Sequence, residues 1–166
     1  MIFSDQLNIE FYKNVINTLP YSVVVCDNNN DFLLWNKATN SIATFNKNVT
    51  NRTDLWEKKY EIWDADKTRK IEFDELPISR ALKGDTVVDF IVLLLNENNP
   101  KGIYLKISAF PLLDENTNAQ SGAMGIFEDI TKKQTSLRAA LLELDAVTLE
   151  IDEILVRFKG LRKYLV

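Results

Sequence analysis

The chain has 166 residues, 46% of them hydrophobic, with a formal net charge of −4 and no histidine. The acidic balance provides no basic surface for nucleic acid, and the missing histidine excludes Ser-His-Asp and Cys-His catalytic sites and histidine-ligated zinc or haem iron within this chain. No apolar run approaches the roughly 20 residues of a membrane span, so a soluble protein is predicted, and the single Cys26 excludes an internal disulfide and favours a reducing, cytoplasmic compartment.

The first predicted element is a helix that starts near Ser4 and ends at Leu19, because a proline follows. Its apolar stripe repeats every four residues and is widened by two neighbours: Leu7, Phe11, Val15 and Leu19, with Tyr12 and Ile16. A hairpin is predicted next, with strands at 22–27 and 32–35 on either side of a turn rich in asparagine and aspartate. Asn36 is then predicted to cap a short helix.

Two more helices are predicted in the middle of the chain. The first covers 55–63 and places three aromatic residues on one face, Trp56, Tyr60 and Trp63. These aromatic residues are predicted to pack against a sheet, with stacking on a planar ligand as the alternative. The second helix covers 74–83 and ends at Gly84, a residue type that often follows a helix.

Three strands are predicted after these helices, at 86–96, 103–112 and 121–131. The middle strand alternates between two sets of residues, so its two faces differ: Ile103, Leu105, Ile107 and Ala109 against Tyr104, Lys106, Ser108 and Phe110. The order of elements is a helix, two strands, several short helices and three strands. This order predicts an α+β domain with an antiparallel sheet.

Short stretches in this order resemble the PAS domain of bacterial sensor proteins. They are Leu19-Pro20, Asp27, Trp35-Asn36, 75–85, 108–112 and 127–131. One departure is Asn30-Asp31, in a turn where the family usually places glycine, although asparagine adopts the same backbone. The resemblance implies a PAS-like five-stranded antiparallel sheet with short helices on one face, which encloses a small pocket.

The resemblance also bears on cofactors, since many PAS domains hold a haem, a flavin or a small metabolite in this pocket. Histidine-ligated haem is excluded because the chain has no histidine. The flavin adduct of the related LOV domains requires a cysteine in the helices of the middle of the domain. Cys26 instead lies on the first predicted strand, where it is expected to be a small buried apolar residue. We therefore predict no cofactor, with a small apolar ligand or a non-covalent flavin as the alternative.

Residues 64–75 resemble a twelve-residue EF-hand calcium loop. Oxygen-bearing side chains occupy loop positions 1, 3, 5, 9 and 12, namely Asp64, Asp66, Thr68, Glu72 and Glu75. Against calcium, Arg69 occupies position 6, where the sharp turn requires glycine, and Pro77 lies where the second helix should run. In the EF-hand family such loops normally occur in pairs, and this chain has no second one. A solvated loop is the competing interpretation.

The C-terminal part, 132–166, is predicted to be one long helix with a heptad seam. The seam residues follow a 4-3 spacing: Leu137, Leu141, Leu144, Thr148, Ile151, Leu155 and Phe158. Two flanking rows add more apolar surface than a two-stranded coiled coil uses: Val147, Ile154 and Leu161 on one side, and Leu142, Leu149 and Val156 on the other. The pattern predicts a homodimer, formed through the helices at both ends of the chain, or a helix bundle. Mixed charge signs argue against a membrane-surface helix.

The resemblance also assigns a role to the point where the last strand meets this helix. In the PAS family an Asp-Ile-Thr sequence forms the hinge between the sheet and the signalling helix. Asp129, Ile130 and Thr131 match that sequence here. From the residues alone, Asp129 or Thr131 is predicted to cap the first turn of the helix.

The predicted organisation is an N-terminal flanking helix (1–19), a PAS-like sensory domain (20–131) and a C-terminal signalling and dimerisation helix (132–166). The predicted function is a non-catalytic sensory and dimerisation module of a two-component signal-transduction protein, with an output kinase or another effector domain as partner. No nucleophile–base pair or phosphate-binding glycine loop points to an enzyme. The alternative function is a small-molecule or calcium-binding regulatory domain.

Overall fold

The computed structural model describes residues 5–42, 60–96 and 99–162 of the chain. The chain divides into two compact units, Met1–Ile130, called the sheet unit below, and Thr131–Val166. The sheet unit contains, in chain order, α1 (Asp5–Asn17), β1 (Ser22–Asp27), β2 (Phe32–Trp35), α2 (Thr39–Ile42), β3 (Glu61–Asp64), the 3-10 helix η1 (Phe73–Glu75), α4 (Pro77–Ala81), β4 (Val87–Asn96), β5 (Asn99–Leu113) and β6 (Gln120–Asp129). The second unit contains the helix α5 (Thr131–Arg162).

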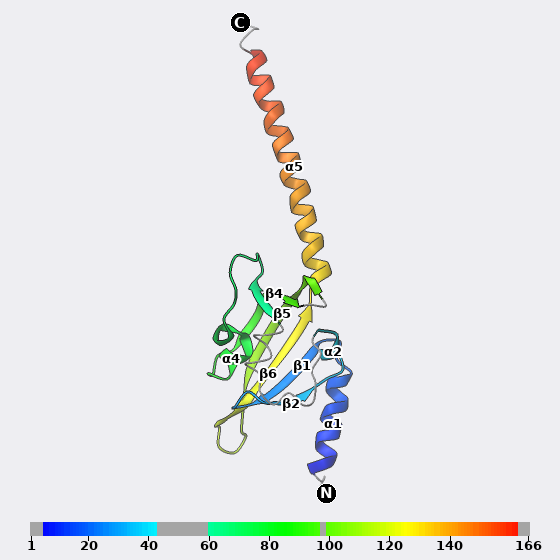
Figure 1. The fold of residues 1–166 in the computed structure, drawn as a ribbon, viewed down its shortest axis with the longest axis vertical. Coiled ribbons are helices and arrows are strands. Elements are labelled where there is room, and N and C mark those ends of the chain that lie inside the picture. The colour runs from blue at the N-terminus through cyan, green and yellow to red at the C-terminus, as the bar shows by residue number, and fades with distance from the viewer. Residues whose placement is uncertain (1–4, 43–59, 97–98, 163–166) are drawn as a thin grey trace. The chain divides into compact units, whose positions relative to one another are not determined.

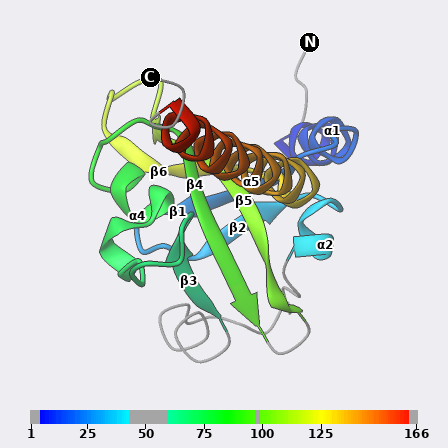
Figure 2. The same cartoon turned by 90° about the horizontal axis from the view of Figure 1, so that it is seen from above.

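The strands of the sheet unit form one antiparallel sheet in the order β2-β1-β6-β5-β4-β3 (Figures 1 and 2). The β-branched run at 23–25 lies in β1, which pairs with β2 on one side and β6 on the other. The long strands β4 and β5 form a hairpin. The predicted α+β fold with an antiparallel sheet and a long C-terminal helix is therefore confirmed, with six described strands instead of the five expected.

The additional strand is β3, which lies where the sequence analysis predicts the end of a helix. It pairs with β4, and Trp63 lies opposite Leu93. Ile62 packs against the cluster on the inner face of the sheet, whereas Trp63 packs against the cluster on the other face. This alternation has the period of a strand, and pairing with β4 satisfies the backbone of β3. The helix prediction is thus wrong at 61–63, while Trp56 lies outside the described residues.

The predicted helix at 74–83 is divided in two. Pro77 begins α4, and the residue before it, Leu76, has extended backbone with a ψ of 142°. A proline disfavours helical backbone in the residue that precedes it, so one continuous helix cannot pass through Leu76. The segment consists instead of η1, the extended Leu76 and α4, and Gly84 follows with a φ of 96°.

The inner face of the sheet, covered by α2 and α4, carries most of the core. Its largest cluster is built from Ile42, Ile71, Val92, Leu94, Ile103, Leu105 and Ile107. A second cluster allows α4 to approach the sheet closely because its members are small: Cys26, Ala81, Ala109 and Ala123. The predicted alternation along β5 is confirmed by the buried side chains on its inner face, although Tyr104 on the opposite face is buried as well.

Asn36 has a different role from the predicted helix cap. Its side chain is buried, and α2 begins only at Thr39. Asn36 Oδ1 accepts the Val23 N–H at 3.0 Å and the Thr39 hydroxyl at 2.9 Å. Asn36 Nδ2 donates to the carbonyl oxygens of Ile16 and Tyr21, both at 2.8 Å. One buried amide therefore ties the end of α1 to β1 and to the start of α2.

The helix α5 has 32 residues. Among the helices in the described ranges, none combines the length and the apolar character needed to cross a bilayer. Helix α1 ends at Asn17, two residues before the predicted end, and the Asn17 side-chain oxygen accepts the Lys37 N–H at 2.8 Å. The end of α1 is thus held by the chain segment that follows β2.

Candidate functional site

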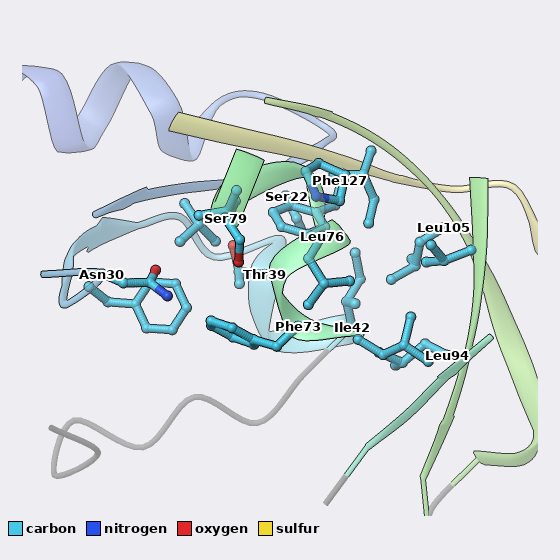
Figure 3. A pocket seen from close by; sticks show the side chains of 17 residues that line it. Ser22, Asn30, Thr39, Ile42, Phe73, Leu76, Ser79, Leu94, Leu105 and Phe127 are labelled. Atoms are coloured by element: carbon cyan, nitrogen blue, oxygen red, sulfur yellow. The ribbon is translucent and has the colours of Figure 1, made fainter. Parts of the chain in front are cut away.

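A cavity of about 60 Å³ lies between the inner face of the sheet and the elements α2, η1 and α4. Its lining includes Ser22 and Val24 of β1, Thr39 and Ile42 of α2, Phe73 of η1, Pro77 and Ser79 of α4, Leu94 of β4, Leu105 of β5 and Phe127 of β6. Figure 3 shows Leu94 and Leu105 at one end of the cavity and Asn30, from the turn between β1 and β2, at the other. Phe32 of β2 and Ile62 of β3 also line it, so nine elements distant in sequence meet around one space.

The lining of this cavity is predominantly apolar. Among the described residues that line it, none carries a charged side chain. Three buried residues contribute hydroxyl groups: Ser22, Thr39 and Ser79. The Thr39 hydroxyl bonds to Asn36, whereas Ser22 Oγ has no hydrogen-bond partner within the part of the chain that the structure describes. An apolar cavity with a few placed polar groups is typical of a small-molecule site.

The sequence analysis did not identify this cavity's polar residues, although β1 contains a signal for one of them. Ser22, Val24 and Cys26 alternate along the strand, so all three lie on the same face. Cys26 is 1% exposed, as predicted for a small apolar residue, and Val24 is also 1% exposed. A serine that shares the face of two buried apolar residues is expected to be buried too, which would have indicated an inward hydroxyl.

The predicted calcium loop forms a tight hairpin that continues from β3. Trp63 and Lys70 form a β-bridge across it, and Lys67 has a φ of 57° in the turn. The Asp64 carboxylate accepts the backbone N–H of Thr68 at 2.6 Å and also accepts the Thr68 hydroxyl. These hydrogen bonds lower the pKa of Asp64. The structure therefore brings Asp64 and Thr68 together through an internal turn of the hairpin.

The last residue of the predicted calcium loop, Glu75, pairs with a cation of the same loop. Its two carboxylate oxygens accept from the Arg69 guanidinium at 2.7 and 3.0 Å, and this pairing lowers the pKa of Glu75. Glu75 also accepts the backbone N–H of Glu72 at 3.0 Å, while Asp66 is exposed. Within the described residues no three side chains suited to a metal ion converge. This geometry favours the solvated loop.

The predicted junction follows the end of β6. Asp129 is the last residue of β6, and Thr131 is the first residue of α5. Between them, Ile130 is 7% exposed and donates its N–H to the Tyr104 carbonyl at 2.9 Å. Its side chain packs with Leu93 and Tyr104 on the outer face of the sheet. The residue immediately before α5 is therefore held firmly within the sheet unit.

Ile130 is the last of four apolar residues that cross the outer face of the sheet, called the outer-face row below. Trp63 of β3 lies opposite Leu93 of β4, and Leu93 lies opposite Tyr104 of β5. Tyr104 in turn bonds the backbone of Ile130. The Lys70 ammonium lies 5.3 Å from the centre of the Trp63 ring, over its face. The row connects the edge strand β3 to the residue before α5. Trp63 takes part in it as a residue of the sheet itself, on the opposite face from Tyr60, and not from a helix packed against the sheet as predicted.

The predicted dimer seam lies along α5. Its described large apolar residues are each 49–61% exposed: Leu137, Leu141, Leu144, Ile151 and Leu155. Thr148 is exposed as well, and the side chain of Phe158 lies outside the described part. The flanking residues Leu142, Val147, Leu149, Ile154 and Val156 are also exposed. A helix with this much exposed apolar surface is typical of one that packs against a partner.

No protein-family model and no curated protein matches the sequence. Solved structures do match the fold. The chain is similar to a PAS domain from a two-component sensor histidine kinase, with a TM-score of 0.51 and 12% identity over 76% of this chain and 99% of that chain.

Two further similar structures are also PAS domains. One is from a Colwellia psychrerythraea protein, with a TM-score of 0.49 and 17% identity over 75% of this chain and 98% of that chain. The other is from nitrogen regulation protein NR(II) of Vibrio parahaemolyticus, with a TM-score of 0.47 and 11% identity over 72% of this chain and 97% of that chain. From the similarity to the sensor kinase domain, the fold of this chain is that of a PAS domain.

Proposed function

We propose that this chain is a non-catalytic PAS-type sensory and dimerisation module of a signal-transduction protein, which passes a change in the sheet to α5. The observation that carries this proposal is the exposed apolar seam of α5 in a chain whose sheet unit has the PAS fold. Such a seam requires a partner helix. A second copy supplies an identical seam, and two-fold symmetric dimers are the commonest protein assemblies.

The proposed output partner is a kinase or another effector domain. The support for a kinase is the shared fold with the PAS domain of a two-component sensor histidine kinase. This chain contains no histidine, so a phosphorylated histidine must lie on another segment or protein. The buried free thiol of Cys26 supports a reducing, cytoplasmic location for the module.

The first prediction concerns the α5 seam. We expect the native chain to sediment as a dimer at micromolar concentrations and Leu144→Asp to sediment as a monomer. Leu144 occupies a central seam position, and burying an unpaired carboxylate between two apolar helix faces costs on the order of several kcal/mol. Sedimentation velocity over a series of protein concentrations measures the effect.

The matched control for this prediction is Ala146→Asp. Ala146 is exposed and lies two residues after Leu144, roughly 200° around the helix from the seam centre. The substitution adds the same charge at nearly the same height on α5 but on the side away from the seam, so the dimer should persist. A native chain that stays monomeric, or two variants that sediment alike, would contradict dimerisation through the seam.

The proposed route of the signal is the outer-face row. Its four residues give the sheet a continuous apolar contact from β3 to Ile130, and Ile130 is covalently followed by the first residue of α5. A strained or displaced strand then changes how Ile130 is held and thereby the first turn of α5. We further propose that Asp129 and Thr131 stabilise this turn as caps, a contribution of about 0.5–2 kcal/mol.

The second prediction tests this route with two adjacent substitutions. Leu93→Ala and Leu94→Ala are both expected to destabilise the sheet unit by about 2–5 kcal/mol, because both leucines are buried. Leu93 belongs to the outer-face row and Leu94 to the inner core. We expect only Leu93→Ala to speed hydrogen exchange in the first turn of α5, by roughly fivefold or more, the lower end of typical allosteric coupling.

Hydrogen exchange resolved at 134–138, where the N–H groups bond to the carbonyl oxygens of 130–134, measures this difference, with the middle of α5 as an internal reference. If both variants speed exchange at these amides equally, the effect reflects lost stability of the sheet unit, and the outer-face row has no special role. If neither variant changes it, the sheet is not coupled to α5 through Ile130.

A further inference from the structure

Helix α5 carries apolar residues on two separate faces. Figure 1 shows α5 as one unbroken helix, in which successive residues lie about 100° apart around the axis. By this spacing Val147 lies about 60° from the seam residue Leu144 and widens the seam, as does Ile154. The other flanking row does not join the seam. It lies about 100° from the opposite edge of the seam and consists of Leu142, Leu149 and Val156.

Two small residues extend this row into a second face. Ala139 and Ala146 lie about 40° from the row, on the side away from the seam. The second face therefore consists of Ala139, Leu142, Ala146, Leu149 and Val156, and the first four follow a 3-4 spacing. Its three large residues are 67–70% exposed, whereas the described apolar seam residues are 49–61% exposed. The second face thus holds the most exposed large apolar side chains among the described residues of α5.

Carboxylates line both sides of the second face. Asp145 and Asp152 flank it on the side toward the seam, Glu143 and Glu150 flank it on the other side, and Glu153 lies within it. All five are exposed. From 139 to 156 the helix contains no lysine or arginine, so the formal charge of this stretch is −5. The second face is therefore an apolar strip between two rows of negative charge.

A second copy of α5 does not match this face. The acidic stretch 139–156 occupies the middle of the helix, which spans 131–162. In a symmetric pair of fully overlapping helices, this stretch lies beside itself whether the helices run parallel or antiparallel. Pairing through the second face would place its carboxylates against like charges, which repel. The seam avoids most of this repulsion, because its flank at Val147 and Ile154 is apolar.

We propose that the second face binds a basic amphipathic helix of another protein, with a strip of leucine and alanine between rows of lysine or arginine. The cations of that helix pair with the carboxylates on both sides, and Ala139 and Ala146 allow the two helix axes to approach closely. The proposal goes beyond the proposed function, because it assigns a partner to a surface that dimerisation through the seam leaves uncovered. A two-fold dimer presents this surface twice.

The binding test uses two synthetic helical peptides that are long enough to cover 139–156. Both carry leucine and alanine at 3-4 spacing, with lysine at the other positions of one peptide and glutamate at those of the other. Fluorescence anisotropy with the full chain measures both affinities. We expect the lysine peptide to bind at least roughly a hundredfold more tightly than the glutamate peptide. Its affinity should fall roughly tenfold or more as salt rises from about 0.1 to 1 M, because the screening length falls from about 10 to 3 Å.

Leu149→Gln tests whether the peptide binds at the second face. The substitution removes the central apolar residue and keeps a good helix former, so we expect the lysine peptide to bind roughly tenfold or more weakly. Val147→Gln is the matched control, because it makes a similar change about 140° around the helix, beside the seam. It should leave the peptide affinity unchanged within about twofold. Without peptide, Leu149→Gln should sediment as the native chain does.

Three results would overturn the inference. They are equal affinities of the two peptides, a peptide affinity that Leu149→Gln leaves unchanged, and a Leu149→Gln chain that loses the native oligomeric state. The last result would assign the second face to further copies of this chain. A native chain that sediments as a monomer would instead contradict the proposed function alone, because the peptide and Leu149→Gln test the second face in a monomer as well.

Discussion

Asn36→Ala is expected to lower the free energy of unfolding by about 3–4 kcal/mol, a large part of the 5–15 kcal/mol typical of a domain. Asn36 is 1% exposed and makes hydrogen bonds to four groups. Alanine replaces none of them. The largest cost comes from the Val23 N–H, which loses its acceptor inside the sheet unit, where no solvent replaces it.

The same substitution should release the end of α1. The Asn36 amide donates to Ile16 of α1 and to Tyr21, so Asn36→Ala loses both of these bonds and keeps the Lys37–Asn17 bond. We therefore expect faster hydrogen exchange along the last turn of α1 than the global destabilisation accounts for. Urea unfolding measures the free energy of unfolding, and we expect its dependence on urea concentration to be unchanged. Hydrogen exchange measures the local effect at the end of α1.

Asn17→Ala is the control, because it makes the same chemical change at the same end of α1. Its oxygen accepts one exposed backbone N–H, from Lys37 at 2.8 Å. Water replaces that bond easily, so we expect a loss of only about 0.5–1 kcal/mol. Equal losses in the two variants would mean that the buried amide contributes no more than an exposed one, contrary to its four hydrogen bonds.

The parts of the fold that the sequence predicts are those in which one local pattern decides the outcome. The alternation along β5 follows from apolar residues at every second position, and the structure buries Ile103, Leu105 and Ile107 together. The turn before β2 follows from its Asp and Asn residues, with Asp27 Oδ1 accepting two backbone N–H groups. In both cases the pattern lies within one short segment, and the structure it predicts does not depend on residues from a distant segment.

The predictions that fail depend on such distant partners. Strand β3 has four residues, too few for a periodic signal, and it becomes a strand because the edge of β4 is available for pairing. The role of Asn36 depends on Ile16, Tyr21 and Val23, which only the fold brings around one amide. The residue type and the position of Asn36 favour a helix cap, but its side chain instead forms hydrogen bonds to groups from other segments of the fold.

The features of the candidate site likewise differ in how far the sequence predicts them. The seam of α5 is visible in the sequence because all its residues belong to one helix and repeat at heptad spacing. The family resemblance implies a pocket, but its lining is not visible in the sequence, since the walls come from nine elements and the space depends on how closely the helices approach the sheet. The outer-face row is predictable only in part. The sequence singles out Ile130, because it lies in the Asp-Ile-Thr sequence. It does not show the other three members, because strand register alone places Trp63 opposite Leu93 and Leu93 opposite Tyr104.

Gly122→Ala is expected to destabilise the sheet unit by about 3–5 kcal/mol, because it separates two central strands. A Cβ at this position would lie 2.1 Å from the carbonyl oxygen of Cys26, a backbone atom of β1. Gly122 is paired with Asp27 of β1, so the clash cannot be relieved by rotating a side chain. Strand β1 must instead move away from β6, with loss of ladder hydrogen bonds.

Cys26 provides a direct probe of this opening. It is the only cysteine of the chain, is 1% exposed, and lies in β1 opposite Ala123 of β6. Its side chain lies in the cluster beneath α4, so a thiol reagent can reach it only when this part of the sheet unit opens, by separation of β1 and β6 or by displacement of α4. If Gly122→Ala makes opening easier by about 3 kcal/mol, the thiol should react at least roughly a hundredfold faster under native conditions.

Gly84→Ala separates the steric effect from the general cost of replacing a glycine. Gly84 has a φ of 96°, and a Cβ there would meet no atom within 4 Å. Its replacement should therefore cost only the strain of positive φ, about 1–2 kcal/mol, and leave the Cys26 reaction rate close to native. A Gly122→Ala variant that matches Gly84→Ala in both stability and thiol reactivity would show that β1 and β6 tolerate a side chain between them.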